Sequence, residues 1–411
     1  MMPRVTSHDP PGNHAESAGT VIDRYHLLRE IGEGGMGTVW LAEQTEPITR
    51  QVALKVIKLG MDTREVVQRF EAERQALALM DHPGIAKVLD GGATATGRPY
   101  FVMELVDGVP ITEYCDESRL ELRERLELFA RVCEAIQHAH QKGIIHRDIK
   151  PSNVLVTEQD GEAAPKVIDF GIAKATGAEL AQATMFTQVG QLLGTPEYMA
   201  PEQAGASGES ADVDTRADVY SLGVLLYELL TGTKTFDLAS VLDSGYEELL
   251  RTIREVDPVR PSTRVSGLGQ SATEIAATRR SEPTTLSRHL RGDVDWIVMK
   301  ALEKDRERRY ETANELGLDV RRYLASEPVL AVPPSALYRW RKLVQRRRKT
   351  VVAVAVIAIL FVAGTIGTGV GYWRTLQANE KLDVALDEKG AALAAEVTQR
   401  ELAIANAERA R

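Results

Sequence analysis

The feature that most restricts the fold of this 411-residue chain is an uncharged segment near its C-terminus. No charged residue occurs in residues 350–373, and residues 351–362 are all apolar. A helix of this length can cross a hydrocarbon core of about 30 Å, and Tyr372 and Trp373 are typical interfacial anchors. A buried core helix is the alternative, but the segment is too long and too uniformly apolar. The uncharged segment therefore predicts one transmembrane helix over residues 350–373.

Basic residues are concentrated on one side of this segment. The preceding flank contains Arg339, Arg341, Lys342, Arg346, Arg347, Arg348 and Lys349. The following flank contains only Arg374 before Lys381. Because cytoplasmic flanks carry an excess of Lys and Arg, we expect the preceding part in the cytoplasm and the tail outside. The basic flank can also contact anionic membrane lipid, and a nucleic-acid patch is the weaker alternative.

The tail after this segment, residues 374–411, is rich in Ala, Glu, Leu and Arg and is expected to be helical and coiled-coil-like. Its nearly heptad-spaced apolar residues are Leu382, Leu386, Leu393, Val397 and Ile404. Lys389 and Gly390 interrupt this seam. Within the apolar segment, the spacing of Gly367 and Gly371 could let two helices approach closely, so a homodimer is a candidate arrangement.

The part before the apolar segment is long enough for one or two domains. Residues 1–24 are expected to be a disordered N-terminus without the apolar run of a secretory signal. We expect one folded domain over residues 25–328 and a basic juxtamembrane segment over 329–349. Within the domain, residues 205–214 and 262–283 are polar and are expected to be surface insertions. A net charge of −9 is no basic signature, so no nucleic-acid partner is expected.

The segment His146–Asn153, with the sequence His-Arg-Asp-Ile-Lys-Pro-Ser-Asn, concentrates chemically capable side chains. Asp148 can accept a proton from an attacking hydroxyl, and Lys150 can neutralise phosphate charge. Asn153 and the downstream Asp169, in Asp-Phe-Gly, can supply oxygen ligands to Mg²⁺, a hard cation. These residue types in this order predict phosphoryl transfer.

Residues 31–39 contain a glycine pattern suited to phosphate binding. The pattern Gly-x-Gly-x-x-Gly consists of Gly32, Gly34 and Gly37. Glycine lets backbone N–H groups approach phosphates without a Cβ in the way. A dinucleotide-binding turn would require a helix directly afterwards, whereas residues 38–42 are β-like. A second predicted strand, residues 51–57, carries Lys55 in an apolar run, where an unpaired charge is costly.

These segments together resemble the glycine-rich, catalytic and metal-binding loops of protein kinases. The chain is similar to bacterial eukaryotic-like (Hanks-type) transmembrane serine/threonine protein kinases over residues 25–324. The resemblance implies an α+β, bilobal protein-kinase fold with a β-rich N-lobe and a helical C-lobe, followed here by one transmembrane helix and a helical tail. It also implies a single-pass protein of the inner (plasma) membrane, with the kinase domain cytoplasmic and the tail extracytoplasmic.

The resemblance implies a role in phosphoryl transfer for each of the polar residues named in these segments. Asp148 would orient or deprotonate the substrate hydroxyl, and Lys150 would stabilise the γ-phosphate. Asn153 and Asp169 would hold Mg²⁺, with Mn²⁺ as an alternative, and Lys55 would position the ATP phosphates. A lysine two residues after the catalytic aspartate is the serine/threonine pattern. The implied activity is that of a non-specific serine/threonine protein kinase, with ATP and protein substrates as partners.

The resemblance also implies that Lys55 pairs with an acid from the following helix, which the apolar spacing predicts over residues 64–80. Glu71 and Glu73 both compete for this role. Glu73 is favoured because its spacing to His82 resembles the family pattern.

The resemblance places the adenine of ATP between the glycine-rich loop and the strand that enters the hinge. Met103 would border the adenine pocket, although ordinary core packing is an alternative for this residue. The residues expected to contact ATP are Ile31, Gly32, Glu33, Gly34, Gly35, Met36, Gly37, Thr38, Val39, Ala53, Lys55, Met103, Glu104, Val106 and Leu155.

The segment from Asp169 to Glu202 resembles an activation segment, for which Arg147 would bind a phosphate. Thr184 and Thr187 are predicted sites of autophosphorylation, and the alternative is that they are ordinary polar loop residues. Two further expectations are structural: Glu202 pairs with Arg309, and Asp218 anchors the backbone of the catalytic loop.

Two other functional classes fit parts of the pattern. A pseudokinase scaffold would lack Lys55, Asp148 or Asp169, and all three are present. A sensor receptor with kinase output would need a larger extracytoplasmic part than residues 374–411. The chain is therefore interpreted as a membrane-anchored signalling kinase. Cys115 and Cys133 are expected to be two reduced thiols.

Overall fold

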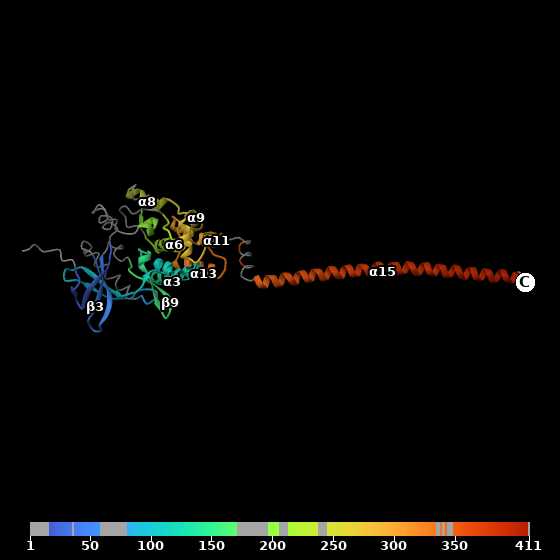
Figure 1. Cartoon of the computed structure of the whole chain (residues 1–411), viewed down its shortest axis with the longest axis horizontal. Helices are drawn as coiled ribbons and strands as arrows, with labels where there is room; N and C mark the ends of the chain where they lie inside the picture. The colour runs from blue at the N-terminus through green and yellow to red at the C-terminus, as the bar shows by residue number, and fades with distance from the viewer. Residues whose placement is uncertain are drawn as a thin grey trace, which may run out of the picture. The chain divides into compact units, whose positions relative to one another are not determined.

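The computed structural model describes residues 16–34, 37–57, 80–170, 196–204, 213–236, 245–333, 338, 342 and 348–409. The chain divides into two compact units, Met1–Ser335 and Ala336–Arg411. Figure 1 shows that the first combines a sheet with many helices and that the second is drawn as one long helix.

The N-lobe is an antiparallel sheet of six strands in the order β1-β2-β3-β4-β6-β5. The strands are β1 Val21–Ile22, β2 Tyr25–Gly34, β3 Gly37–Gln44, β4 Arg50–Ile57, β5 Val88–Ala93 and β6 Pro99–Glu104. The two strands predicted around residues 38–42 and 51–57 are confirmed. The expectation of disorder over residues 1–24 is wrong at its end, because Val21 and Ile22 pair with β2.

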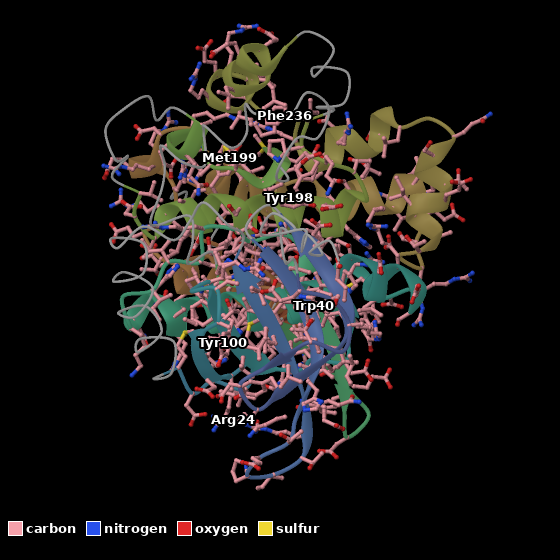
Figure 2. All side chains as sticks on the ribbon, turned by 90° about the vertical axis from the view of Figure 1, so that its left-hand side faces the viewer. Arg24, Trp40, Tyr100, Tyr198, Met199 and Phe236 are labelled. Carbon is pink, nitrogen blue, oxygen red and sulfur yellow. The ribbon has the colours of Figure 1, made fainter. Side chains whose placement is uncertain are left out.

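One face of this sheet packs into the core of the lobe, and the opposite face carries predicted ATP-contacting residues. Alternate residues of β4, namely Val52, Leu54 and Val56, are buried in the core of the lobe, where Trp40 and Tyr100 also lie (Figure 2). The intervening residues must point to the opposite face, because successive side chains of a strand alternate. That face carries Ala53 and Lys55, with Met103 paired to Ala53 and Val39 paired to Lys55. Strand alternation thus gathers four of the predicted ATP-contacting residues.

The C-lobe is helical. Its helices are α2 Ile111–Glu117, α3 Leu122–Gln141, α5 Pro201–Ala204, α6 Arg216–Thr231, α8 Tyr246–Glu255, α9 Pro261–Gly267, α10 Ser271–Ala277, α11 Pro283–Leu290, α12 Asp293–Ala301 and α13 Ala313–Leu324. Almost all residues of α6 are buried, as is expected of a helix that is apolar on every side. It packs against α3, α9, α12 and α13 and forms the centre of the lobe.

A small second sheet carries the polar loops. Its strands are β7 Val109–Pro110, β8 Val154–Gln159 and β9 Glu162–Val167, in the order β7-β8-β9. Strand β8 begins directly after Asn153, and β9 ends two residues before Asp169. Because Val154 pairs with Val167, the hairpin brings these two polar residues to the same end.

The expectation that residues 262–283 form a surface insertion is wrong. The segment folds into α9, α10 and the start of α11, and it buries Val265 and Ala276 in the core. Arg279 is also buried, and its guanidinium donates to the carbonyls of Leu229 and Leu230 at the end of α6. Each short helix contributes only one or two apolar residues, which is too few to give a periodic signal in a polar background. The other expected insertion, 205–214, lies outside the described residues except for 213 and 214.

The second unit contains α15 Arg348–Arg409, a continuous helix of 62 residues. In the part of the chain that the structure describes, it is the one helix long and apolar enough to cross a membrane by length and composition. The tail predicted to be helical is helical as far as Arg409, where the described residues end, and Lys389 and Gly390 do not end the helix.

Candidate active site

The β8–β9 hairpin brings Asn153 beside the Asp169 loop. Asn153 ends a single 3₁₀ turn, Pro151–Asn153, and the N–H of Ile168 donates to its carbonyl at 2.9 Å. Asp169 is the next residue after Ile168. This bond from the neighbour of Asp169 holds the Asp169 loop beside Asn153, so the two residues predicted to hold a metal lie on adjoining segments.

The carboxylate of Asp148 is held by its neighbours in the catalytic loop. Asn153 Nδ2 donates to the Asp148 carbonyl at 2.7 Å and to Asp148 Oδ2 at 3.1 Å. Lys150 Nζ lies 2.9 Å from the same Oδ2. Asp148 and Lys150 are both partly exposed. The structure thus brings together three of the predicted site residues around one carboxylate that a substrate can reach.

Lys55 joins the N-lobe to this loop cluster. Its Nζ donates to Asp169 Oδ1, and its side chain is mostly buried. Such a lysine requires a partner, since burying an unpaired charge is costly. The predicted partner Glu73 lies outside the described residues. Among the described residues, the ion-pair partner of Lys55 is Asp169.

The backbone of the catalytic loop is anchored by Asp218, as predicted. This carboxylate is fully buried in α6 and accepts the N–H groups of His146 at 2.7 Å and Arg147 at 2.8 Å. His140 Nε2 lies 2.8 Å from Asp218 Oδ2. Burial acts to raise the pKa of Asp218, but the contacts with His140 and His146 outweigh it and lower the pKa. These bonds stabilise Arg147 at φ +63°, a left-handed conformation that is unfavourable for a side chain of this size.

His146, for which the sequence predicts no separate role, connects the catalytic loop to the Asp169 loop. Its ring lies 4.6 Å from that of Phe170, and its Nε2 lies 3.1 Å from the Ile168 carbonyl. Its Nδ1 accepts the N–H of Asp148 at 3.3 Å. Burial lowers the pKa of His146, so the ring is neutral near pH 7, with Nε2 as the donor. Its Nδ1 can then remain an acceptor for Asp148.

The glycines of the phosphate-binding pattern differ in their surroundings. A Cβ on Gly37 would lie 2.2 Å from the Val56 carbonyl oxygen, whereas a Cβ on Gly32 would have no neighbour within 4 Å. Gly37 is therefore required for strand packing, and Gly32 leaves space beside the backbone. Gly35 and Met36 lie outside the described residues.

The other predicted ATP contacts lie along the strands. Ile31 and Glu33 are exposed in β2, Thr38 and Val39 are partly buried in β3, Ala53 is buried in β4, Met103 and Glu104 end β6, Val106 follows β6, and Leu155 is partly buried in β8. The N–H of Glu104 donates to the Lys87 carbonyl at 2.8 Å. A ligand in the hinge would therefore use other backbone groups of residues 104–106.

The activation segment is described only at its ends. Thr184 and Thr187 lie outside the described residues. At the far end, Glu202 forms the predicted ion pair with Arg309. Both cysteines are free, as predicted, and both are also buried. Burial raises the pKa of Cys115 to about 11 and raises that of Cys133 further.

The donor set of Asn153 and Asp169 suits a hard divalent cation. Because Asn153 Nδ2 donates to Asp148, its Oδ1 is directed away from that residue. No group of three His, Cys, Asp or Glu side chains suited to a metal occurs among the described residues. An amide oxygen and one carboxylate nevertheless fit Mg²⁺, which takes few protein ligands and completes its shell with water and substrate phosphates.

The sheet, the helical lobe and the loop cluster are those of a protein kinase. The family model described as protein kinase domain matches residues 25–316. The chain therefore belongs to the protein kinase family.

Bacterial serine/threonine kinases are among its relatives. It is 38% identical over 312 residues to the serine/threonine-protein kinase PknB of Mycobacterium leprae, which covers 74% of this chain and 44% of that protein. It is 34% identical over 346 residues to the serine/threonine-protein kinase Pkn1 of Myxococcus xanthus, covering 78% and 47%. The crystal structure of the Mycobacterium tuberculosis PknI kinase domain aligns with a TM-score of 0.53 at 25% identity, covering 76% and 99%. The chain spans less than half the length of these two curated relatives.

Proposed function

We propose that this chain transfers the γ-phosphoryl group of ATP to serine and threonine hydroxyls of proteins. The observation that carries the proposal is the loop cluster, in which Asn153 and Lys150 hold the Asp148 carboxylate while Lys55 reaches Asp169 from the N-lobe. Its similarity to serine/threonine-protein kinases supports serine and threonine as acceptors.

In this mechanism the substrate hydroxyl donates its proton to Asp148 as its oxygen bonds to the γ-phosphorus. The bond from the γ-phosphorus to the β–γ bridging oxygen breaks, and ADP leaves. Lys150, within an ion-pair distance of Asp148, neutralises charge on the transferred group. Little covalent chemistry is required of the protein, so catalysis depends on positioning and electrostatics.

The remaining residues orient the nucleotide. Asn153 and Asp169 would hold Mg²⁺, or Mn²⁺, which supplies charge neutralisation to the phosphates. Lys55 would bind the α- and β-phosphates, and Glu73 would pair with Lys55. The backbone near Gly32 has room for the phosphates, and the hinge backbone of residues 104–106 would bind adenine.

Asp148→Asn tests the mechanism. The amide cannot accept the hydroxyl proton, so we expect incorporation of ³²P from labelled ATP to fall by about 10²-fold or more. Asp160→Asn is a matched control, because Asp160 is exposed in the β8–β9 turn at φ +53°, which Asn tolerates. Equal incorporation by Asp148→Asn and wild type would overturn the proposal.

Autophosphorylation of Thr184 and Thr187 is part of the proposal. Arg147 precedes the catalytic aspartate and would bind the resulting phosphate. Mass spectrometry after incubation with ATP and Mg²⁺ should find phosphate on at least one of the two threonines. An active enzyme with phosphate on neither contradicts this part.

We further propose that the chain is anchored in the inner membrane by residues 350–373, with the domain of residues 25–328 and the basic segment 329–349 in the cytoplasm. Support comes from the apolar part of α15 and the basic flank. Anionic lipid would bind the basic segment, and Gly367 and Gly371 would allow a homodimer.

Introducing a charge tests the anchor. Leu360→Arg places a cation in the middle of the apolar segment, where insertion costs about 3 kcal/mol, and should release the protein from alkaline-washed membranes. Leu386→Arg, in the same helix but beyond the apolar segment, should stay bound. Equal retention of both variants would refute the assigned span.

A further inference from the structure

A partly buried ion pair links the end of β6 to β9. Lys166 Nζ donates to Glu104 Oε1, and the side chains are 11% and 34% exposed. Neither side chain has a role in the mechanism above, which uses only the backbone of Glu104. Lys166 pairs across the hairpin with Leu155, and its strand leads directly to Asp169.

Glu104 also holds the segment that precedes β5. Its N–H donates to the Lys87 carbonyl at 2.8 Å, and its Oε2 accepts the Lys87 N–H at 3.3 Å. Lys87 is therefore bound through both of its backbone polar groups by one hinge residue.

The same segment is bonded to β9. The N–H of Ala86 donates to the Val167 carbonyl at 3.0 Å, and the N–H of Val167 donates to the Gly84 carbonyl at 2.8 Å. Residues 84–87 thus lie between the hinge and β9. The Glu104–Lys166 pair closes this arrangement with a direct side-chain link.

We propose that Glu104 and Lys166 are a positioning pair that sets the spacing between the hinge and Asp169. This inference rests on the proposed function, in which adenine binds at the hinge and the phosphates bind near Asp169. A ligand that binds at both ends gains affinity only when the ends are preorganised at the correct separation. A ligand that binds at one end does not sense that separation.

The distinguishing experiment compares two ligands on the full chain in detergent. Adenosine reaches only the hinge, whereas the non-hydrolysable analogue AMP-PNP with Mg²⁺ spans the hinge and Asp169. Lys166→Met removes the cation but keeps an apolar stem of similar length, and the Glu104 carboxylate that loses this partner is 34% exposed and so can be hydrated. Calorimetric titration should show AMP-PNP binding weakened by about fivefold or more, because one partly buried ion pair is lost. Adenosine binding should change less than about twofold, because the hinge backbone is unaltered.

Further variants separate positioning from general stability. Lys166→Arg keeps the cation and should bind AMP-PNP like wild type. Asp81→Asn is the matched control, because it removes an exposed ion pair to Lys87. In this pair the Lys87 side chain is 59% exposed and the Asp81 side chain is 86% exposed. Asp81→Asn should leave AMP-PNP binding unchanged. Glu104→Gln with Lys166→Met should weaken AMP-PNP binding no more than Lys166→Met alone, since both changes break one link.

Equal weakening of both ligands, or no weakening by Lys166→Met, would overturn the positioning role. Additive losses in the double variant would also overturn it. Failure of the wild-type chain to bind AMP-PNP with Mg²⁺ would instead refute the proposed function, and this inference with it.

Discussion

Arg309 and Glu202 form a bidentate ion pair in which Arg309 Nη1 and Nη2 donate to the two carboxylate oxygens at 2.7 and 2.8 Å. The Arg309 side chain is 0% exposed. Its guanidinium also donates to the carbonyls of Glu303, Lys304 and Arg216. One buried arginine therefore connects α5, at the end of the activation segment, to the start of α6 and to the loop after α12.

Removing the carboxylate partner should destabilise the C-lobe. Glu202→Ala leaves the buried Arg309 charge uncompensated, and we expect the free energy of unfolding to fall by about 3 kcal/mol. The neighbouring Arg308, 68% exposed, forms a surface pair with Glu303. Arg308→Ala should cost less than about 1 kcal/mol. Urea unfolding followed by tryptophan fluorescence compares the two, and equal losses would contradict the importance of the buried pair.

Asp218 should make stability depend on pH on the acid side. Its pKa is lowered in the folded state from 3.8, because the His140 and His146 contacts outweigh the effect of burial. As pH falls, this carboxyl therefore binds its proton at a higher pH in the unfolded state than in the folded state. The stability that the Asp218 carboxylate contributes is present above pH 3.8 and is lost as pH falls through the folded pKa.

Asp218→Asn should remove this acid dependence. It should also lower stability at pH 7 by about 2–4 kcal/mol, since the amide cannot accept both buried N–H groups. Unfolding measured at pH 7 and near pH 3 tests both effects. If the free energy of unfolding of the variant falls between pH 7 and pH 3 by as much as that of wild type, the assignment of this acid dependence to Asp218 is contradicted.

Two glycines of the nucleotide loop should respond differently to alanine. Gly37→Ala places a Cβ against the Val56 backbone, so we expect a loss of at least about 2 kcal/mol in stability. Gly32→Ala meets open space and should change stability by less than about 0.5 kcal/mol while raising the KM for ATP. Thermal unfolding and ATP-dependence assays separate the effects, and a destabilised Gly32→Ala would argue against a ligand role.

Lys304 should make stability rise with pH on the alkaline side. Burial lowers its pKa to about 8 from 10.5, against the raising effect of Asp257. Between these values the unfolded chain holds a proton that the folded chain has lost, so stability increases with pH. We expect a rise on the order of 1 kcal/mol after allowance for solvent screening. Lys304→Met should abolish it in unfolding experiments at pH 7.5 and about 10; an identical rise in the variant would assign it to other groups.

Much of the site could be predicted because its residues are close in sequence. Asp148, Lys150 and Asn153 lie in one short loop, and a hairpin between Asn153 and Asp169 needs only local strand pairing. Lys55 is predictable as a site residue because a lysine in an apolar strand requires a partner. The same argument predicts a partner for Lys166, which precedes the apolar residues Val167 and Ile168.

The helices over residues 262–283 could not be predicted in the same way. Their stability depends on distant backbone groups, such as the α6 carbonyls that Arg279 binds. A polar segment with few apolar residues gives no local sign of such a partner.

The sequence by itself determined the family, the order of the chemical groups and the apolar segment, because these depend on residue identity and short spacing. Only the tertiary structure decided which carboxylate each of two mostly buried lysines meets. Lys55 meets Asp169 across 114 residues, and Lys166 meets Glu104 across 62. Such choices depend on how strands from two lobes pack, since a buried charge pairs with whatever the fold brings within reach.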